Sequence, residues 1–457
     1  MDNSEYRNVE NNNHNRHKMD PRRRIQVQLV GGVDRPLLIT IIILLCLGTV
    51  MVFSASYPYA NATFNGDSYH FVKRQLLFML LGLAAMVITM NWDKINYHFL
   101  RKISKPTLVF SIIALAGVLV FGKELNGARR WYALGPITIQ PSEIVKFALV
   151  LFFADYGDKY ANKISRRGEY KAVLTSVLPF VAIAGIGAGM MLVFDNKIVG
   201  AVFAAIIMLT AFVSIFVTNM KTQAPAFYYG ILPYGILLGI VGVLMYMQPH
   251  LSGLIIMCGI TFIMMLLSGT NAKYLVAGTV GGGGLMYLLA KTMGHSSSRL
   301  QVWEDPFSYL LEGGWQPAQS LYAIGSGGLW GVGFGNSRQK HLYLPEPQND
   351  YIFSIWCEEM GFVGALIVIL IFMFFIYRGI KIGINAPDKF SSLLVIGIIS
   401  HVGLQMLLNI AVVTNSLPST GIALPFFSYG GTSLIILLAE MGVVLSVSRY
   451  SSLENTR

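Results

Sequence analysis

Residues 37–55 read LLITIIILLCLGTVMVFSA, an unbroken run without a charged side chain. As a helix, this run would be about 28 Å long at roughly 1.5 Å per residue, close to the thickness of a bilayer's hydrocarbon core. It therefore predicts a helix that spans a membrane.

Similar apolar runs recur along the chain and predict twelve membrane-spanning helices. Their expected ranges are 37–55, 75–91, 106–122, 138–155, 174–194, 198–217, 228–247, 251–268, 274–293, 352–377, 391–413 and 425–447. We expect an all-α polytopic membrane domain over residues 34–448. A disordered cytoplasmic tail at 1–33 should precede it, and a short cytoplasmic tail at 449–457 should follow it.

The composition agrees with this interpretation. Only 12% of the 457 residues are charged, about half the roughly 25% of soluble domains, and 54% are hydrophobic. A soluble protein of this size could not bury so much apolar surface. The composition also excludes a disordered chain and argues against an outer-membrane barrel, whose strands alternate polar and apolar residues.

The charge pattern predicts the orientation. The formal net charge is +11, which in a soluble protein would suggest nucleic-acid binding. Here the Lys and Arg residues gather in the loops after the second, fourth, sixth, eighth and tenth predicted spans. Cytoplasmic loops are rich in Lys and Arg, so we expect these loops and both termini in the cytoplasm and no nucleic-acid partner.

The long connection over 294–351 then lies outside, between the ninth and tenth predicted spans, and shows no obvious helix. Connections of this length are more often functional than passive. It contains the acidic Asp305 and Asp350 as candidate general bases, and Arg338 and Lys340 as candidate anion ligands. The three cysteines lie apart in apolar segments, so no disulfide framework or structural metal site is expected.

Two further groups flank the fourth predicted span. Arg129 and Arg130 precede Trp131, a combination that suits a phosphate group at a membrane surface but also an interfacial anchor. Glu143 and Lys146 are three residues apart and share a helical face, with Ser142 as a candidate helix cap. This pair is either a structural ion pair or a functional one.

A last segment, over residues 415–433, is dense in Pro and Gly. It includes Ser428, Tyr429 and Gly430. Broken backbone of this kind at membrane depth is tolerated only where it lines protein or a cavity.

Together these motifs resemble the SEDS family of cell-wall polymerases, the FtsW, RodA and SpoVE group. Four blocks carry the resemblance: residues 126–131 with 140–146, Glu304-Asp305-Pro306, residues 325–359, and residues 418–433. The segment Phe53–Pro58 is more similar to FtsW and SpoVE than to RodA.

The resemblance implies a peptidoglycan glycosyltransferase of the bacterial cytoplasmic membrane. Such enzymes polymerise lipid II, an undecaprenyl-pyrophosphate disaccharide-pentapeptide, beside a class B penicillin-binding protein and other division or elongation proteins. Asp305 matches the family's key acid and is our candidate base. The expected substrate contacts are Arg129, Arg130, Trp131, Glu143, Lys146, Arg338, Lys340, Asp350, Ser428, Tyr429 and Gly430.

Several questions stay open at the level of sequence. A divalent cation, Mg²⁺ or Mn²⁺, would suit the pyrophosphate leaving group, although no ligand set for it is visible. His250 stands where the family has an Asp, and residues about 174–230 add a hairpin to the ten spans typical of the family. A lipid II flippase and a non-catalytic scaffold are the alternative functions, and division, sporulation and elongation are all compatible roles.

Overall fold

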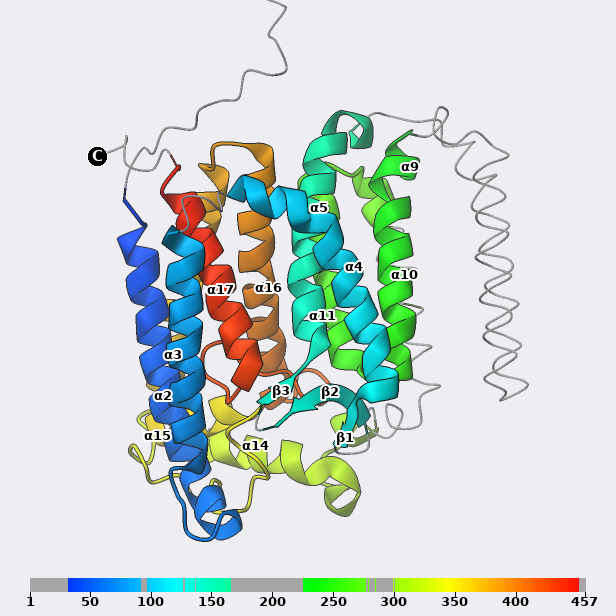
Figure 1. Cartoon of the computed structure of the whole chain (residues 1–457). Helices are drawn as coiled ribbons and strands as arrows, with labels where there is room; N and C mark the ends of the chain where they lie inside the picture. The colour runs from blue at the N-terminus through cyan, green and yellow to red at the C-terminus, as the bar shows by residue number, and fades with distance from the viewer. Residues whose placement is uncertain are drawn as a thin grey trace, which may run out of the picture.

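The computed structural model describes residues 32–91, 97–125, 128–135, 137–165, 225–276, 278, 284, 299 and 301–451. Within these residues the fold is a bundle of long helices with a small sheet at one end (Figure 1). The predicted spans 174–194, 198–217 and most of 274–293 lie outside the described residues, as do the added hairpin up to residue 224 and most of both tails.

The other nine predicted spans are helical. Eight stretches of the described residues are long and apolar enough to cross a membrane. The long helices are α2 (Arg35–Thr63), α3 (His70–Asn91), α4 (Tyr97–Phe121), α5 (Pro141–Ile164), α9 (Pro225–Gly230) with α10 (Leu232–Met247), α11 (Leu251–Ser268), α15 (Ile352–Ile384), α16 (Lys389–Val413) and α17 (Gly431–Ser448). The fold is therefore a polytopic helical membrane domain, as predicted.

A three-stranded antiparallel sheet precedes α5 and was not predicted. Its strands β1 (Lys123–Leu125), β2 (Ala128–Leu134) and β3 (Ile137–Ile139) pair in sequence order. Two hydroxyl groups fix it to the bundle: Tyr132 donates to the Ala114 carbonyl of α4 at 2.8 Å, and Thr432 of α17 donates to the Thr138 carbonyl at 2.8 Å. Residues 138–140, predicted to begin the fourth span, thus belong to the sheet and its exit.

The long connection is also more ordered than predicted. It contains a π-helical turn, η2 (Leu310–Gly314), followed by the helix α14 (Trp315–Gly327). The sheet and α14 lie at the same end of the bundle, which we call the sheet end (Figure 1). The expectation of a connection without a helix was wrong, because the small and polar residues of α14 gave no long apolar run.

Charged residues fasten the opposite end of the bundle. Asp34 caps α2 by accepting from the Leu37 amide at 2.9 Å, and its carboxylate pairs with Arg378 of α15 at 2.8 Å. Arg101 of α4 bridges to Asp155 and Asp158 of α5 at 3.0 and 2.8 Å. These ion pairs hold helix ends in register while the apolar middles of the helices supply the core.

Candidate active site

The sheet positions the first predicted group. Arg129 lies on β2 opposite Glu124 of β1, and its Nε is 3.4 Å from that carboxylate. Trp131, two residues on, pairs with Lys123. Arg129 is exposed, and its ion pair with Glu124 is weak because both side chains face solvent. Its guanidinium therefore stays accessible to an external anion.

Arg130 does not fit the predicted anion site. Its Nε donates to the Gln248 carbonyl at 3.0 Å, and another guanidinium nitrogen donates to the Pro249 carbonyl. Burial and the nearby Arg299 lower the pKa of Arg130. Arg130 therefore joins the sheet to the end of α10, because carbonyls beyond a helix's last turn need donors.

His250 forms a hub beside Arg130. Its Nε2 lies 3.0 Å from the Gln140 side-chain nitrogen and its Nδ1 lies 3.1 Å from the Ser252 hydroxyl. Burial, Arg130 and Lys146 lower the pKa of His250 to about 3, so the imidazole is neutral. Because the Gln140 amide nitrogen can only donate, this contact fits the His250 tautomer that has its proton on Nδ1.

The predicted cap of α5 was wrong. The cap position is Gln140, and no side chain caps this helix end. Ser142 instead lies inside the helix and approaches His250 at 3.5 Å. A neutral His250 thus links the start of α5 to the start of α11, where the family pattern has a carboxylate.

Glu143 and Lys146 form the predicted pair on one face of α5, with 2.8 Å between Oε2 and Nζ. The Lys146 side chain is buried, and its ammonium also approaches Gln405 of α16 at 3.4 Å. This geometry is that of a structural ion pair. Glu143 also lines a cavity, so the pair shapes that cavity from the α5 side.

The Pro- and Gly-rich segment closes this cavity at the sheet end. Ser428 and Gly430 line it, together with side chains of α16 and α17. The Ser428 hydroxyl accepts from the Leu424 amide at 2.8 Å, while the Tyr429 amide donates to the Gln348 carbonyl at 2.8 Å. This broken backbone therefore lines a cavity, one of the two surroundings expected for it.

Asp305 lies in an exposed turn at the sheet end. Its carboxylate accepts from the Ser308 hydroxyl at 2.5 Å and from the Ser308 and Phe307 amides at 3.2 Å. These bonds, led by the Ser308 hydroxyl, lower the pKa of Asp305. The carboxylate is therefore ionised at neutral pH and open to an incoming hydroxyl group.

Two anchors hold the segment that leads into Asp305. The Trp303 indole donates to the Asn415 carbonyl at 3.0 Å, and the Asn415 amide returns a bond to the Trp303 carbonyl at 3.1 Å. Arg299 donates to the Ser419 carbonyl at 3.2 Å. The two residues that hold this segment, Asn415 and Ser419, lie on the connection between α16 and α17 (residues 414–430). This connection therefore positions Asp305.

Asp350 meets the same connection. Its carboxylate faces Gly421, and the neighbouring Tyr351 donates to the Ser419 hydroxyl at 3.2 Å. Burial raises the pKa of Asp350 to about 6, with Glu346 adding to the shift and Arg299 opposing it. The structure thus brings both predicted acids of the long connection onto one scaffold.

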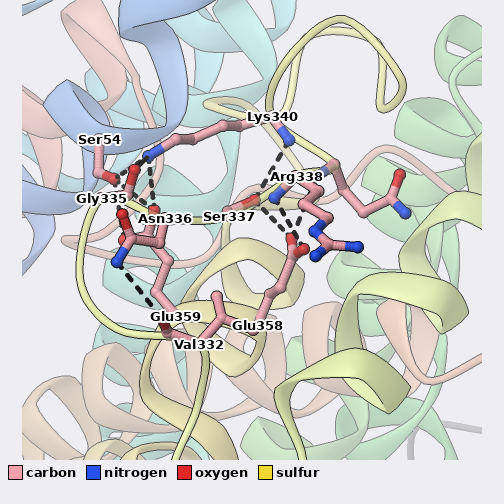
Figure 2. Close-up of polar contacts among 10 residues, drawn as sticks. Ser54, Val332, Gly335, Asn336, Ser337, Arg338, Lys340, Glu358 and Glu359 are labelled. Atoms are coloured by element: carbon pink, nitrogen blue, oxygen red, sulfur yellow. Dashed lines mark hydrogen bonds and ion pairs between the residues drawn. The ribbon is translucent and has the colours of Figure 1, made fainter.

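Arg338 and Lys340 separate in the structure (Figure 2). The buried Lys340 ammonium contacts Glu359 of α15 at 2.7 Å, Ser54 of α2 at 3.1 Å and the Gly335 carbonyl at 2.6 Å. All its donors have partners within the protein. The prediction that Lys340 binds pyrophosphate is therefore not retained, since its role is to fasten the connection to two helices.

Arg338 keeps an exposed guanidinium. Its backbone amide donates to Glu358 at 2.9 Å, and the Gln339 amide donates to the same carboxylate at 3.3 Å. The Arg338 side chain lines an open depression with Tyr322. The Tyr322 ring packs against Phe307 with 5.5 Å between centroids, so this depression lies beside the Asp305 turn.

Arg299 was missed at the level of sequence. Most Lys and Arg residues are expected in the cytoplasmic loops, whereas Arg299 lies in the predicted outer connection. This unusual position is a signal by which the sequence could have identified Arg299 as a candidate functional residue. His401 of α16 was also missed, although a titratable residue within an apolar run is a functional candidate by default. Glu359 of α15 is the partner of Lys340.

No metal site is evident in the described part of the chain, where no three His, Cys, Asp or Glu side chains gather closely enough to hold an ion. Asp305 and Asp350 do not form such a donor set with a third acid. We therefore derive no step through a divalent cation.

Comparison with known proteins agrees with this architecture. The family of cell cycle proteins FtsW, RodA and SpoVE matches residues 35–225 and 203–453. Stage V sporulation protein E of Bacillus subtilis (strain 168) is 37% identical over 426 residues, covering 92% of this chain and 97% of that protein. The probable peptidoglycan glycosyltransferase FtsW of Geobacter sp. (strain M18) is 32% identical, with coverage of 92% and 97%.

Solved structures share the fold. A chain from a peptidoglycan synthase complex, studied for the structural coordination of polymerization and crosslinking, aligns with a TM-score of 0.64 at 23% identity, covering 92% of this chain and 98% of that chain. The rod shape determining protein RodA of Thermus thermophilus aligns with a TM-score of 0.58 at 24% identity and the same coverage. This chain is a polytopic membrane protein of the FtsW, RodA and SpoVE family.

Proposed function

We propose that the chain is a peptidoglycan glycosyltransferase that polymerises lipid II at the outer face of the cytoplasmic membrane during division or sporulation. The observation that carries the proposal is the ionised, exposed Asp305 carboxylate, anchored through Trp303 and Arg299 to the connection that Asp350 also contacts. Full-length relatives named as glycosyltransferases support it.

The chemistry is an inverting glycosyl transfer. Asp305 accepts the proton of the acceptor's 4-hydroxyl as that oxygen attacks C1 of the donor. The bond between C1 and the pyrophosphate breaks, undecaprenyl pyrophosphate leaves, and the α linkage becomes β. The exposed Arg129 and Arg338 offer cationic groups to the leaving group, which develops charge as the bond breaks.

The orientation follows from the distribution of basic residues. In the described residues, the end of the bundle opposite the sheet carries Arg101, Lys163, Arg378 and Lys389. Positive loops face the cytoplasm, so the sheet end with Asp305 faces outward, where lipid II is polymerised. We propose that both termini are cytoplasmic and that the protein acts at the septum.

A class B penicillin-binding protein is the proposed partner, because a similar fold occurs in a peptidoglycan synthase complex. The test uses the purified chain with that partner, in vesicles that contain fluorescent lipid II. Glycan ladders on a gel would support the polymerase. Transfer of lipid II between leaflets without ladders would indicate a flippase, and neither activity would indicate a scaffold; both results would contradict the proposal.

A further inference from the structure

Two ionisable side chains meet inside the bundle, in a place that the proposed chemistry does not use. His401 lies in the middle of α16 and Glu440 in the middle of α17. The His401 Nδ1 and a Glu440 oxygen are 3.4 Å apart, and the side chains are only 5% and 2% exposed. Both helices cross the membrane, so the pair is far from either helix end.

The polar atoms of this pair lack hydrogen bonds. Neither nitrogen of His401 and neither oxygen of Glu440 has a hydrogen-bond partner, although buried polar groups in proteins are nearly always satisfied. Both side chains line the cavity that Glu143 and Ser428 also line. Its free volume of about 40 Å³ admits one to three water molecules, so the site is small, and its mainly apolar lining surrounds a few ionisable side chains.

The charges around the cavity do not balance without an added proton. Glu143 is neutralised by Lys146 on α5, whereas no basic side chain among the described residues pairs with Glu440 except His401. The neighbouring α3 has its ionisable residues only within its first two turns, and those of α15 lie nearer its two ends. A lone carboxylate in the middle of a membrane domain is costly, so one positive charge is missing.

We propose that His401 and Glu440 together hold one proton, which makes this cavity a proton-binding site within the membrane domain. The proton converts a charged carboxylate beside a neutral imidazole into a pair without net charge. The site joins α16 to α17, and the connection between these helices holds the Arg299 and Asp350 scaffold. Proton occupancy therefore acts on the packing that positions the outer acids, whether or not the chain transfers glycosyl groups.

The test measures protons released on unfolding. The full chain is unfolded at equilibrium in mixed micelles between pH 7 and 9, as wild type, Glu440→Gln, and Glu440→Gln with His401→Gln. Above about pH 7.5 an unfolded chain binds almost no proton at either group, since an unperturbed His has a pKa of about 6.5. If the folded pair keeps its proton, unfolding of the wild type releases one proton that neither variant releases. The unfolding equilibrium constant of the wild type should then rise by an additional factor of about ten per pH unit compared with that of either variant.

A matched control is Ser433→Ala, which changes a side chain that lines the cavity and does not titrate. It should keep the wild-type slope. Equal slopes in wild type and Glu440→Gln would overturn the proposal. So would a wild-type stability that depends on sodium or potassium concentration while the slopes stay equal, because a monovalent cation would then supply the missing charge.

Discussion

Single side chains set the electrostatics of the candidate site at the sheet end. Asp305 keeps an ionised carboxylate because three donors from its own turn stabilise the charge. Asp350, on the same scaffold, is shifted the other way by burial, to a pKa of about 6. Two acids of one site are thus tuned in opposite directions, and only Asp350 titrates near neutral pH.

Asp350 predicts a pH dependence of stability. Its folded pKa exceeds the unfolded value of about 3.9, so the folded state binds the proton more tightly. Stability should therefore fall by about 2–3 kcal/mol as the pH rises from about 4 to 6, and Asp350→Asn should not show this loss. Equilibrium unfolding at pH 4.5 and 7 measures this, and an identical pH dependence in both chains would refute it.

The Lys340 and Glu359 pair predicts a second effect. Lys340→Met would leave the Glu359 carboxylate buried without its partner, at a cost of about 3–5 kcal/mol. Adding Glu359→Gln should recover a large part of that loss, because no uncompensated charge remains. Thermal unfolding of the single and double variants tests the coupling, and a double variant no more stable than Lys340→Met would argue against it.

At the scale of elements, a break within α15 joins that helix to the connection. Gly361 has φ of +67° inside the helix, and a side chain there would collide with the Gly331 amide and the Leu329 carbonyl. The Phe362 amide instead donates to the Gly328 carbonyl at 2.9 Å. At this point, backbone hydrogen bonds to the glycine-rich segment around Gly328 replace the regular hydrogen bonds of the helix.

Gly361→Ala should accordingly destabilise the fold by at least about 1–3 kcal/mol, from backbone strain and collision. The matched control is Gly239→Ala in α10, where a new Cβ meets nothing within 4 Å. That control should be neutral or slightly stabilising, since Ala favours helix more than Gly does. Unfolding of the two variants side by side is the measurement, and equal stabilities would contradict this explanation.

The elements also show which features were predictable. Apolar runs predicted nine helices within the described residues, and eight of these are long and apolar enough to cross a membrane, the exception being α5. The sheet was missed, since strands as short as Lys123–Leu125 and Ile137–Ile139 carry no periodic signal. Spacing along a helix predicted the pair of Glu143 and Lys146, but no local pattern could direct Lys340 to Glu359 or Arg130 to the end of α10.

At the scale of the whole molecule, the bundle has two chemically different ends. One end is fastened by ion pairs such as Arg101 with Asp155, and the other holds the sheet, α14 and the two acids of the site. The scaffold that collects Arg299, Trp303 and Asp350 comes from residues 415–421, distant in the sequence. Only the three-dimensional fold could reveal that assembly.

The proposed orientation predicts a labelling pattern. Leu311 at the sheet end is fully exposed, and Lys389 begins α16 at the opposite end. In intact cells, a membrane-impermeant maleimide should label Leu311→Cys, whereas Lys389→Cys should react only after permeabilisation. The unsubstituted chain provides the background from its three native cysteines. The reverse pattern would invert the topology.

The most direct test of the central claim is the initial rate of lipid II polymerisation by Asp305→Asn, beside Asp67→Asn as a control. Asp67 is another aspartate outside the helices that pairs with Lys73 at 2.9 Å. Loss of the base should lower the rate at least about 100-fold, the usual contribution of general base catalysis. The control should stay near wild type. An Asp305→Asn protein that polymerises at the wild-type rate would contradict the account.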